Sequence, residues 1–185
     1  MRIVGGALRG MQLLSPTTAE TRPTADRVRE SLFNILTHGD YPPFEGALVM
    51  DGFAGTGALG LEAFSRGAAK VFFVENERMA AEICFKNIQK ARGEKNCVLF
   101  KNDICAMAKQ NDGAQMMDYI FLDPPYKKNL AFPALISLKN GGWLGVRSVV
   151  VIEAHKKFRE AVPDDFKLCD ERIYGETMIS VYAGG

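Results

Sequence analysis

The sequence predicts an α/β fold with a mostly parallel, seven-stranded sheet. Apolar runs of strand length recur from residue 47 onward, and segments with helical spacing lie between them. Parallel strands need crossover connections, usually helices, so this alternation is typical of a sheet that helices cover on both faces. Only Gly175 and Glu176 separate the last two runs. Because no crossover fits there, we expect an antiparallel strand pair at the C-terminal end.

The first forty residues predict an extension in front of this sheet. Residues 1–20 hold two short apolar runs around glycines, which is typical of a β-hairpin. Loop-like residues follow, and from Val28 onward apolar side chains recur at helical spacing. We therefore expect a helix over about 24–37, capped by Thr24 and with Asp26 favourably placed near its N-terminus.

The apolar runs also place the strands. The parallel part of the sheet is expected at residues 47–53, 70–76, 96–103, 118–125 and 148–155. The clearest intervening helix is expected at 79–93, and the antiparallel pair at 166–174 and 177–182.

Acidic residues stand at the ends of the five expected parallel strands, namely Asp51, Glu75, Asp103, Asp123 and Glu153. Ligands of such sheets bind at the carboxyl ends of the strands, at the point where the strand order reverses. We therefore expect a binding site rich in carboxylates at this edge. For Glu153 alone we favour a structural role, as a helix cap or in a loop ion pair.

The composition indicates a single domain over residues 1–185, with the hairpin at 1–20, a basic helical segment at 21–40 and a core at 47–185. The 23 Lys and Arg residues nearly balance the 22 Asp and Glu residues, so any surface that binds a polyanion must be local. The four cysteines fit neither a metal knuckle nor a disulfide framework, and we expect reduced, mostly buried thiols and no metal site. No apolar stretch is long enough to span a membrane, and we expect a cytoplasmic monomer.

The segment "DGFAGTGALG" places Gly55, Gly57 and Gly60 between an expected strand and an expected helix. This spacing fits a dinucleotide site, an S-adenosylmethionine site or a purely structural turn. Asp51 favours S-adenosylmethionine, because a carboxylate repels a pyrophosphate but attracts the ammonium of a methionine moiety. Glu75 offers acceptors for ribose hydroxyls, and Asp103, preceded by Asn102, offers one for an adenine amino group.

The segment "DPPY", residues 123–126, follows the expected fourth parallel strand. A nucleobase amino group is a poor nucleophile, because its lone pair is delocalised into the ring. Acceptors on its hydrogens favour a more tetrahedral nitrogen, and the Asp123 carboxylate and the Pro124 carbonyl can supply them. Pro124 and Pro125 fix the backbone that carries these acceptors, and Tyr126 can stack on an unstacked base. We therefore expect methyl transfer to an amino nitrogen, catalysed by Asp123, Pro124, Pro125 and Tyr126.

Six segments spread over nearly the whole chain carry a resemblance: "RIVGGALRG", "RPTADRVRESLFNIL", "DGFAGTGALGLEAFSRGA", "FVEN", "DYIFLDPPY" and "YGETMISVY". With them the sequence resembles the bacterial small-subunit (16S) ribosomal RNA guanine-N2 methyltransferases, the RsmD-like family. The resemblance implies a Rossmann-like, class I S-adenosylmethionine-dependent methyltransferase that modifies one guanine in an assembled or partly assembled 30S particle. Gly52 and Thr56 depart from the motif, which more usually has Leu and Ser, and Gly52 is expected to loosen the end of the first strand.

The expected site has two sides. The cofactor is expected to contact Asp51, Phe53, Ala54, Gly55, Gly57, Glu75, Asn76, Asn102, Asp103 and Ile104. On the substrate side, the resemblance implies Arg22, Thr24, Arg27 and Arg29, and hairpin position adds Arg2 and Arg9 as phosphate contacts. Arg27 and Arg29 fit equally well as solvated or ion-paired helical side chains. Because basic residues are few, we expect weak affinity for free RNA.

Two other functions remain open from the residues alone. "DPPY" does not choose between purines, so the 6-amino group of adenine in DNA is an alternative target, although no region for sequence-specific DNA recognition is evident. A nicotinamide-dependent oxidoreductase or a silent nucleotide-binding module also fits the glycine spacing. The residues near the strand ends include no evident proton-relay His or Tyr-Lys pair, which weighs against an oxidoreductase.

Overall fold

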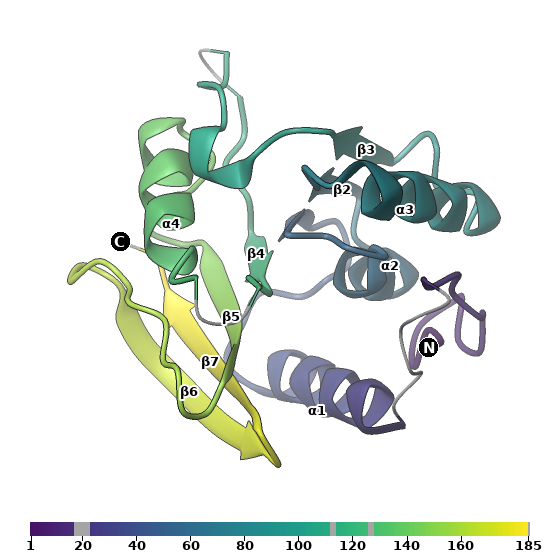
Figure 1. Cartoon of the computed structure of the whole chain (residues 1–185), viewed down its shortest axis with the longest axis horizontal. Helices are drawn as coiled ribbons and strands as arrows, with labels where there is room; N and C mark the ends of the chain where they lie inside the picture. The colour runs from purple at the N-terminus through teal and green to yellow at the C-terminus, as the bar shows by residue number, and fades with distance from the viewer. Residues whose placement is uncertain (17–22, 112–113, 126–127, 185) are drawn as a thin grey trace.

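The computed structural model describes residues 1–16, 23–111, 114–125 and 128–184, with the side chains of residues 23–25 also outside the description. Within these residues a seven-stranded sheet has the order β3-β2-β1-β4-β5-β7-β6 (Figure 1). All neighbouring strands are parallel except β7, which is antiparallel to both β5 and β6. The strands are β1 (Leu48–Gly52), β2 (Lys70–Val74), β3 (Cys97–Phe100), β4 (Tyr119–Leu122), β5 (Val149–His155), β6 (Lys167–Tyr174) and β7 (Thr177–Ala183).

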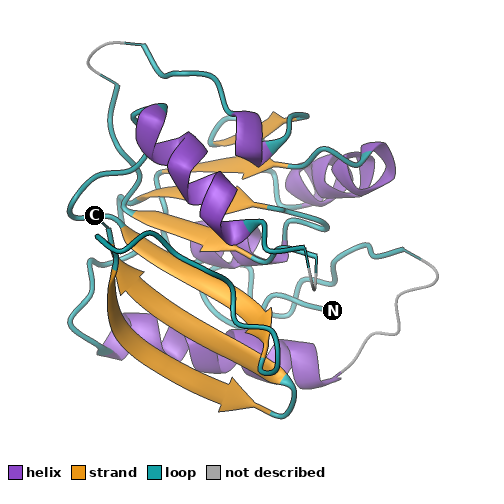
Figure 2. Ribbon diagram, turned by 60° about the vertical axis from the view of Figure 1, so that its left-hand side comes forward, coloured by secondary structure: helices purple, strands orange, loops and turns teal. Residues whose placement is uncertain are grey.

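Helices cover both faces of the sheet (Figure 2). One face packs against α1 (Pro23–His38), α2 (Ala58–Ser65) and α3 (Arg78–Lys90), and the other packs against α4 (Ala131–Asn140) and the short 3-10 helix η1 (Ile104–Ala106). Successive strand residues alternate between the two cores, as the pleat requires. Val49 and Phe121 face the α1 side, whereas Met50 and Leu122 face the α4 side.

The sequence-based fold is confirmed, and its errors lie at the ends of elements. The expected α/β architecture, the terminal antiparallel pair and the helix with Asp26 in its first turn are all present. The helix α1 begins at Pro23, so Thr24 lies inside its first turn and does not cap it. Pro is favoured at this position because its missing N–H has no partner in a first turn anyway.

The N-terminal segment forms a minimal hairpin that docks on α2. Its single antiparallel bridge joins Arg2 to Gln12, and the amide of Ile3 donates to the carbonyl of Met11 at 3.0 Å. The amide of Ala7 donates to the carbonyl of Ser65 at 2.7 Å, at the end of α2. The pairing is too short to form a regular strand, and its backbone groups are satisfied partly within the hairpin and partly by Glu62, Ser65 and Asn87.

The cysteines are less buried than expected. All four are free thiols; Cys84 and Cys97 are buried, Cys105 is half-buried and Cys169 is exposed on β6. Among the described residues, no helix has both the length and the apolar character needed to cross a membrane.

Asn87 connects three parts of the fold. It lies fully buried on α3, and its amide oxygen accepts from the backbone N–H of Leu14 at 2.8 Å. Its amide nitrogen donates to the carbonyls of Leu14 at 3.0 Å and of Thr56 at 2.8 Å. One side chain therefore joins the end of the N-terminal hairpin to the glycine loop.

Replacing Asn87 with Ala is expected to lower the free energy of unfolding by about 2–3 kcal/mol, because buried backbone groups lose their partners. Denaturant unfolding followed by circular dichroism measures this change. Gln89→Ala, at an exposed position of the same helix, is the control and should stay within about 0.5 kcal/mol of the wild type. Equal unfolding midpoints for the two variants would contradict the structural role of Asn87.

Candidate active site

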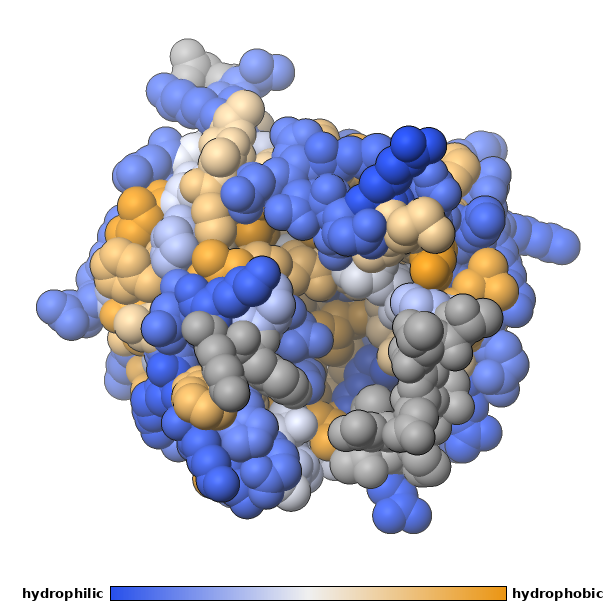
Figure 3. All heavy atoms as spheres, viewed as in Figure 1, coloured by the Kyte–Doolittle hydropathy of each residue, from blue (hydrophilic) through white to orange (hydrophobic). Residues whose placement is uncertain are grey.

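A cavity of about 410 Å³ opens at the carboxyl ends of β1, β4 and β5. The strand order reverses between β1 and β4, and this is the crevice in which ligands of such sheets bind. The face of the molecule shown in Figure 3 is hollowed near its middle. The cavity is lined by Met1, Val28, Arg29, Asp51, Phe53, Ala54, Gly55, Thr56, Ala58, Leu59, Asp123, Glu153, Tyr174, Gly175, Glu176 and Thr177.

The glycine loop turns sharply after β1. Phe53 has a φ of 77°, which is rare for a bulky side chain, and Gly55 has a φ of 54°. The turn is held because the amides of Phe53 and Ala54 both donate to the carbonyl of Val74, at 3.1 and 3.0 Å. Strain of this kind gathers at ligand sites when neighbouring structure enforces it.

The other two glycines of the motif are required by packing. Gly57 starts α2 with a φ of 79°, and a Cβ there would lie 2.9 Å from the sulfur of Cys84. A Cβ on Gly60 would collide with the ring of Phe73 on β2. The glycines therefore bring α2 close to the sheet, while only Gly55 lines the cavity.

Gly52 does not loosen the end of the first strand, contrary to expectation. It pairs with Val74 on one side and with Leu122 on the other. The side chain of Ile104 occupies the place that a Cβ at Gly52 would take. Ile104 is thus a buried core residue beneath the loop, and it does not line the cavity.

Glu75 follows β2 and orients the glycine loop. One carboxylate oxygen accepts from the amide of Gly55 and the other accepts from the amide of Glu77, both at 2.8 Å. A carboxylate oxygen can accept more than one hydrogen bond, so Glu75 still offers acceptors to a ligand.

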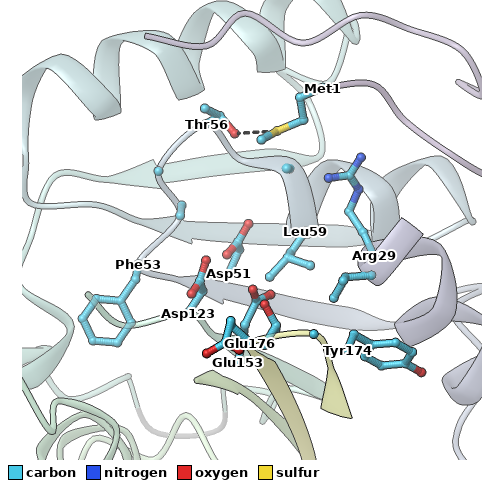
Figure 4. Close-up of a pocket in the computed structure, with 16 residues that line it drawn as sticks. Met1, Arg29, Asp51, Phe53, Thr56, Leu59, Asp123, Glu153, Tyr174 and Glu176 are labelled. Carbon is cyan, nitrogen blue, oxygen red and sulfur yellow. Dashed lines mark hydrogen bonds between the residues drawn. The ribbon is translucent and has the colours of Figure 1, made fainter. Parts of the chain in front are cut away.

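Asp51 is buried, with 2% of its surface exposed, and it points into the cavity (Figure 4). Its Oδ2 accepts from the amide of Gly60 at 2.8 Å. Burial raises the pKa of Asp51 to about 7, against the lowering effect of that hydrogen bond, and the charge of Glu75 adds to the rise. A positively charged ligand group beside Asp51 would reverse this shift.

Asp123, directly after β4, and Glu153, within β5, lie side by side. Leu122 pairs with Ile152 in the parallel register, so the next residue of each strand is an acid. Both acids follow the strand parity of Phe121 and Val151, which face α1, and both line the cavity (Figure 4). The sequence-based preference for Glu153 as a helix cap or loop ion pair is wrong, because Glu153 lies within β5 and lines the cavity.

The surroundings raise the pKa values of both carboxyl groups. Although Asp123 is open to the cavity, the enclosing protein raises its pKa well above the ordinary value, and the charges of Glu153 and Asp51 add to the rise. Burial also raises the pKa of Glu153, while the positive charge of Arg29 opposes that rise. Two acids with raised pKa values in one cleft are typical of a functional site.

Arg29 is buried, with 5% of its surface exposed, so it does not present its charge on an outer face for RNA. Its guanidinium donates to the backbone carbonyl of Arg2 and, at 2.8 Å, to Asp26. Its Nε lies 3.7 Å from a Glu62 oxygen and is a buried nitrogen without a hydrogen-bond partner among the described residues. Arg29 therefore joins the N-terminal segment to the cavity wall.

The remaining predicted substrate contacts lie around the N-terminal segment. Arg2 and Arg9 are exposed and line a small hollow together with Glu30, and Arg27 is exposed on α1. Arg22 falls outside the described residues, as does the side chain of Thr24.

The predicted catalytic motif is described only in part. Pro124 is buried and Pro125 is exposed, while Tyr126 falls outside the described residues. On the cofactor side, Asp51, Phe53, Ala54 and Gly55 line the cavity.

Three of the expected cofactor contacts lie farther along the same edge of the sheet. Asn76, Asn102 and Asp103 are exposed beyond the ends of β2 and β3, outside the enclosed cavity. Asp103 accepts from the amide of Cys105 at 2.9 Å and so begins η1.

Sequence reasoning missed the wall that the last hairpin supplies. The turn between β6 and β7, residues 174–177, closes one side of the cavity, and Glu176 there pairs with Lys156 at 2.7 Å. Met1 closes the opposite side, and its sulfur lies 3.4 Å from the hydroxyl of Thr56. The segment "YGET" was a signal for the first wall, because it belongs to a motif that carries the family resemblance.

The side chains that line the cavity fit S-adenosylmethionine. The glycine loop permits close approach at Gly55, and most of the charged side chains that line the cavity are carboxylates. Asp51 suits an ammonium group, and the acidic wall suits a positively charged sulfonium. A pyrophosphate would meet repulsion from Asp51, Asp123 and Glu153.

Comparisons with known proteins agree with this reading. A family model described as "Conserved hypothetical protein 95" matches residues 1–183. The chain is 33% identical to the ribosomal RNA small subunit methyltransferase D of Escherichia coli (strain K12), covering 98% of this chain and 89% of that protein. The Haemophilus influenzae protein of the same name is 35% identical, with coverages of 98% and 93%.

A solved structure, the putative methyltransferase yhhF from Escherichia coli, superposes with a TM-score of 0.81 at 31% identity. The alignment covers 100% of this chain and 97% of that one, so fold and sequence agree over the whole length. The chain belongs to the conserved hypothetical protein 95 family, the RsmD-like methyltransferases.

Proposed function

We propose that the protein transfers a methyl group from S-adenosylmethionine to the exocyclic 2-amino group of a guanine in 16S ribosomal RNA. One observation carries the proposal: Asp123 and the glycine loop at Gly55 line the same cavity. Parallel pairing of β1 with β4 creates this arrangement. The family match supports ribosomal RNA as the substrate and gives no support to a nicotinamide-dependent reaction.

Three acidic residues along the sheet edge would each bind a different part of the cofactor. Asp51 would bind the ammonium of the methionine moiety, Glu75 the ribose hydroxyls and Asp103 the adenine amino group. When bound, S-adenosylmethionine supplies an electrophilic methyl group on its sulfonium. Phe53, Ala54 and Gly55 would line its path through the cavity, with Gly57 fixing the start of α2 behind them.

On the substrate side, Asp123 and the carbonyl of Pro124 would accept hydrogen bonds from the amino group. These bonds would direct the nitrogen lone pair toward the methyl donor and hold the amine in place. The new N–C bond would form as the bond between the methyl carbon and the sulfur breaks, with its electron pair left on sulfur. The nitrogen would then lose one proton, which the Asp123 carboxylate is positioned to receive. Pro125 would restrict the backbone, and Tyr126 would stack on the base.

The partner would be ribosomal RNA within an assembled or partly assembled 30S particle. Exposed Arg2, Arg9 and Arg27, with Arg22 and Thr24 nearby in sequence, would contact RNA phosphates. Such a small set of cations suits a particle better than free RNA. We further propose a cytoplasmic monomer organised as a hairpin, a basic helical segment and a catalytic core.

Methyl transfer itself can be measured with labelled S-adenosylmethionine and purified small subunits that lack the modification. We expect label in N2-methylguanosine after digestion to nucleosides, with much less incorporation into naked 16S RNA. Label in N6-methyladenosine would favour the adenine alternative instead.

Asp123→Ala is expected to lower kcat by about 100-fold or more, because the amine loses its main acceptor. Binding of S-adenosylmethionine, measured by calorimetry, should stay within about threefold of the wild type. Asp164→Ala, which removes an exposed carboxylate from a loop, is the control and should leave kcat unchanged. An Asp123→Ala variant with wild-type kcat would refute the assigned role.

Affinity for S-adenosylmethionine is expected to rise about tenfold between pH 5.5 and pH 7, since protonated Asp51 attracts an ammonium poorly. The pKa of Asp51 is raised to about 7, so its charged form increases across this range, in which the ligand's α-amino group stays protonated. Calorimetry at several pH values measures the effect. In Asp51→Asn the affinity should be low and its pH dependence flat; an unchanged slope would assign the titration to another group.

A further inference from the structure

Glu153 is a carboxylate that the proposed chemistry has not used. It lies on β5 in the cavity wall, where it is half-buried, and its carboxylate has no hydrogen bond or close ion pair among the described residues. Arg29 attracts it electrostatically, but the Arg29 guanidinium is already bonded to Arg2 and Asp26. A half-buried carboxylate that faces the cavity and has no protein donor is free to accept hydrogen bonds from a ligand.

The position of Glu153 is set by the sheet and not by a loop. Parallel pairing of Leu122 with Ile152 places Asp123 and Glu153 next to each other, and strand parity turns both toward the same cavity (Figure 4). Neighbouring strands lie about 4.8 Å apart, so two adjacent carboxylates can contact adjacent atoms of one flat ring.

The Watson–Crick edge of guanine carries two adjacent donors, the 2-amino group and N1–H. The same edge of adenine carries a lone pair at N1, which a carboxylate repels. Enzymes that act on a base removed from its stack read it through this edge. Two neighbouring carboxylates therefore complement guanine and oppose adenine.

We propose that Glu153 accepts a hydrogen bond from N1–H of the target guanine while Asp123 accepts one from its 2-amino group. Glu153 thereby determines specificity for guanine. This inference rests on the proposed function. Glu153 contacts the substrate beside the reacting nitrogen, and Arg29 behind it helps to keep the carboxylate charged.

The test uses a base that keeps the reacting amine but loses the N1 donor. In 2-aminopurine the 2-amino group is present, and N1 is an acceptor. After the modified guanine is mapped with the wild-type enzyme, small subunits are reconstituted with guanine or with 2-aminopurine at that position. The ratio of kcat/KM for the two substrates is then measured for wild type, Glu153→Gln and Glu153→Ala.

We expect the wild type to prefer guanine by about 100-fold or more. A glutamine amide can accept from N1–H or donate to N1, so Glu153→Gln should bring the two substrates to within about tenfold of each other. Glu153→Ala should be slow on both and also lose the preference. Comparing ratios between variants cancels the effect of the missing O6 of 2-aminopurine.

An unchanged ratio in Glu153→Gln would overturn the inference. Calorimetry with S-adenosylmethionine shows that each variant retains its cofactor pocket, and Glu94→Gln, an exposed charge change on a loop, should behave as wild type. A wild-type enzyme that methylates no guanine would refute the proposed function itself, which is a different outcome from methylation with an unaltered preference.

Discussion

The parallel pairing of β1 with β4 is the constraint on which the site depends. After β1 the chain turns to α2 on one face of the sheet, whereas after β4 it turns toward α4 on the other face. Because the two connections leave in opposite directions, a crevice remains between them. The glycine loop and Asp123 meet in this crevice although they are far apart in sequence.

The crevice holds several acidic side chains close together, which is unfavourable for the stability of the fold. Asp51, Asp123 and Glu153 line one cavity. Burial raises the pKa of Asp51 and of Glu153, and the enclosing protein together with the charges of Glu153 and Asp51 raises that of Asp123. The opposing charge comes from Arg29, which the N-terminal segment holds through the carbonyl of Arg2. The short hairpin therefore has a role beyond its own minimal pairing: it fixes the one cationic side chain among the described lining residues.

The sequence predicted the sheet and the place of the glycine loop because these follow from local patterns. Apolar runs locate strands, and a glycine turn after a strand locates a loop. That Glu153 and Arg29 line the cavity could not be predicted in this way. A charge at a strand end or on a helix is usually solvated or paired, and only the register of β4 with β5 and the path of the N-terminal segment decide otherwise. The prediction that Thr24 caps the first helix was wrong for a similar reason, since Pro23 can itself begin a helix.

The alternation of side chains along β4 and β5 nevertheless places Asp123 and Glu153 together, which local patterns do not show. Once β4 and β5 are paired with Leu122 opposite Ile152, the residues that follow must be neighbours on the same face. A pair of acids at those positions would repel each other in an empty core, so packing does not explain them. Their surroundings become favourable when hydrogen-bond donors enter the cavity, and an amino group beside a ring N–H supplies two adjacent donors. The arrangement is thus best understood as one half of an interaction that the substrate completes.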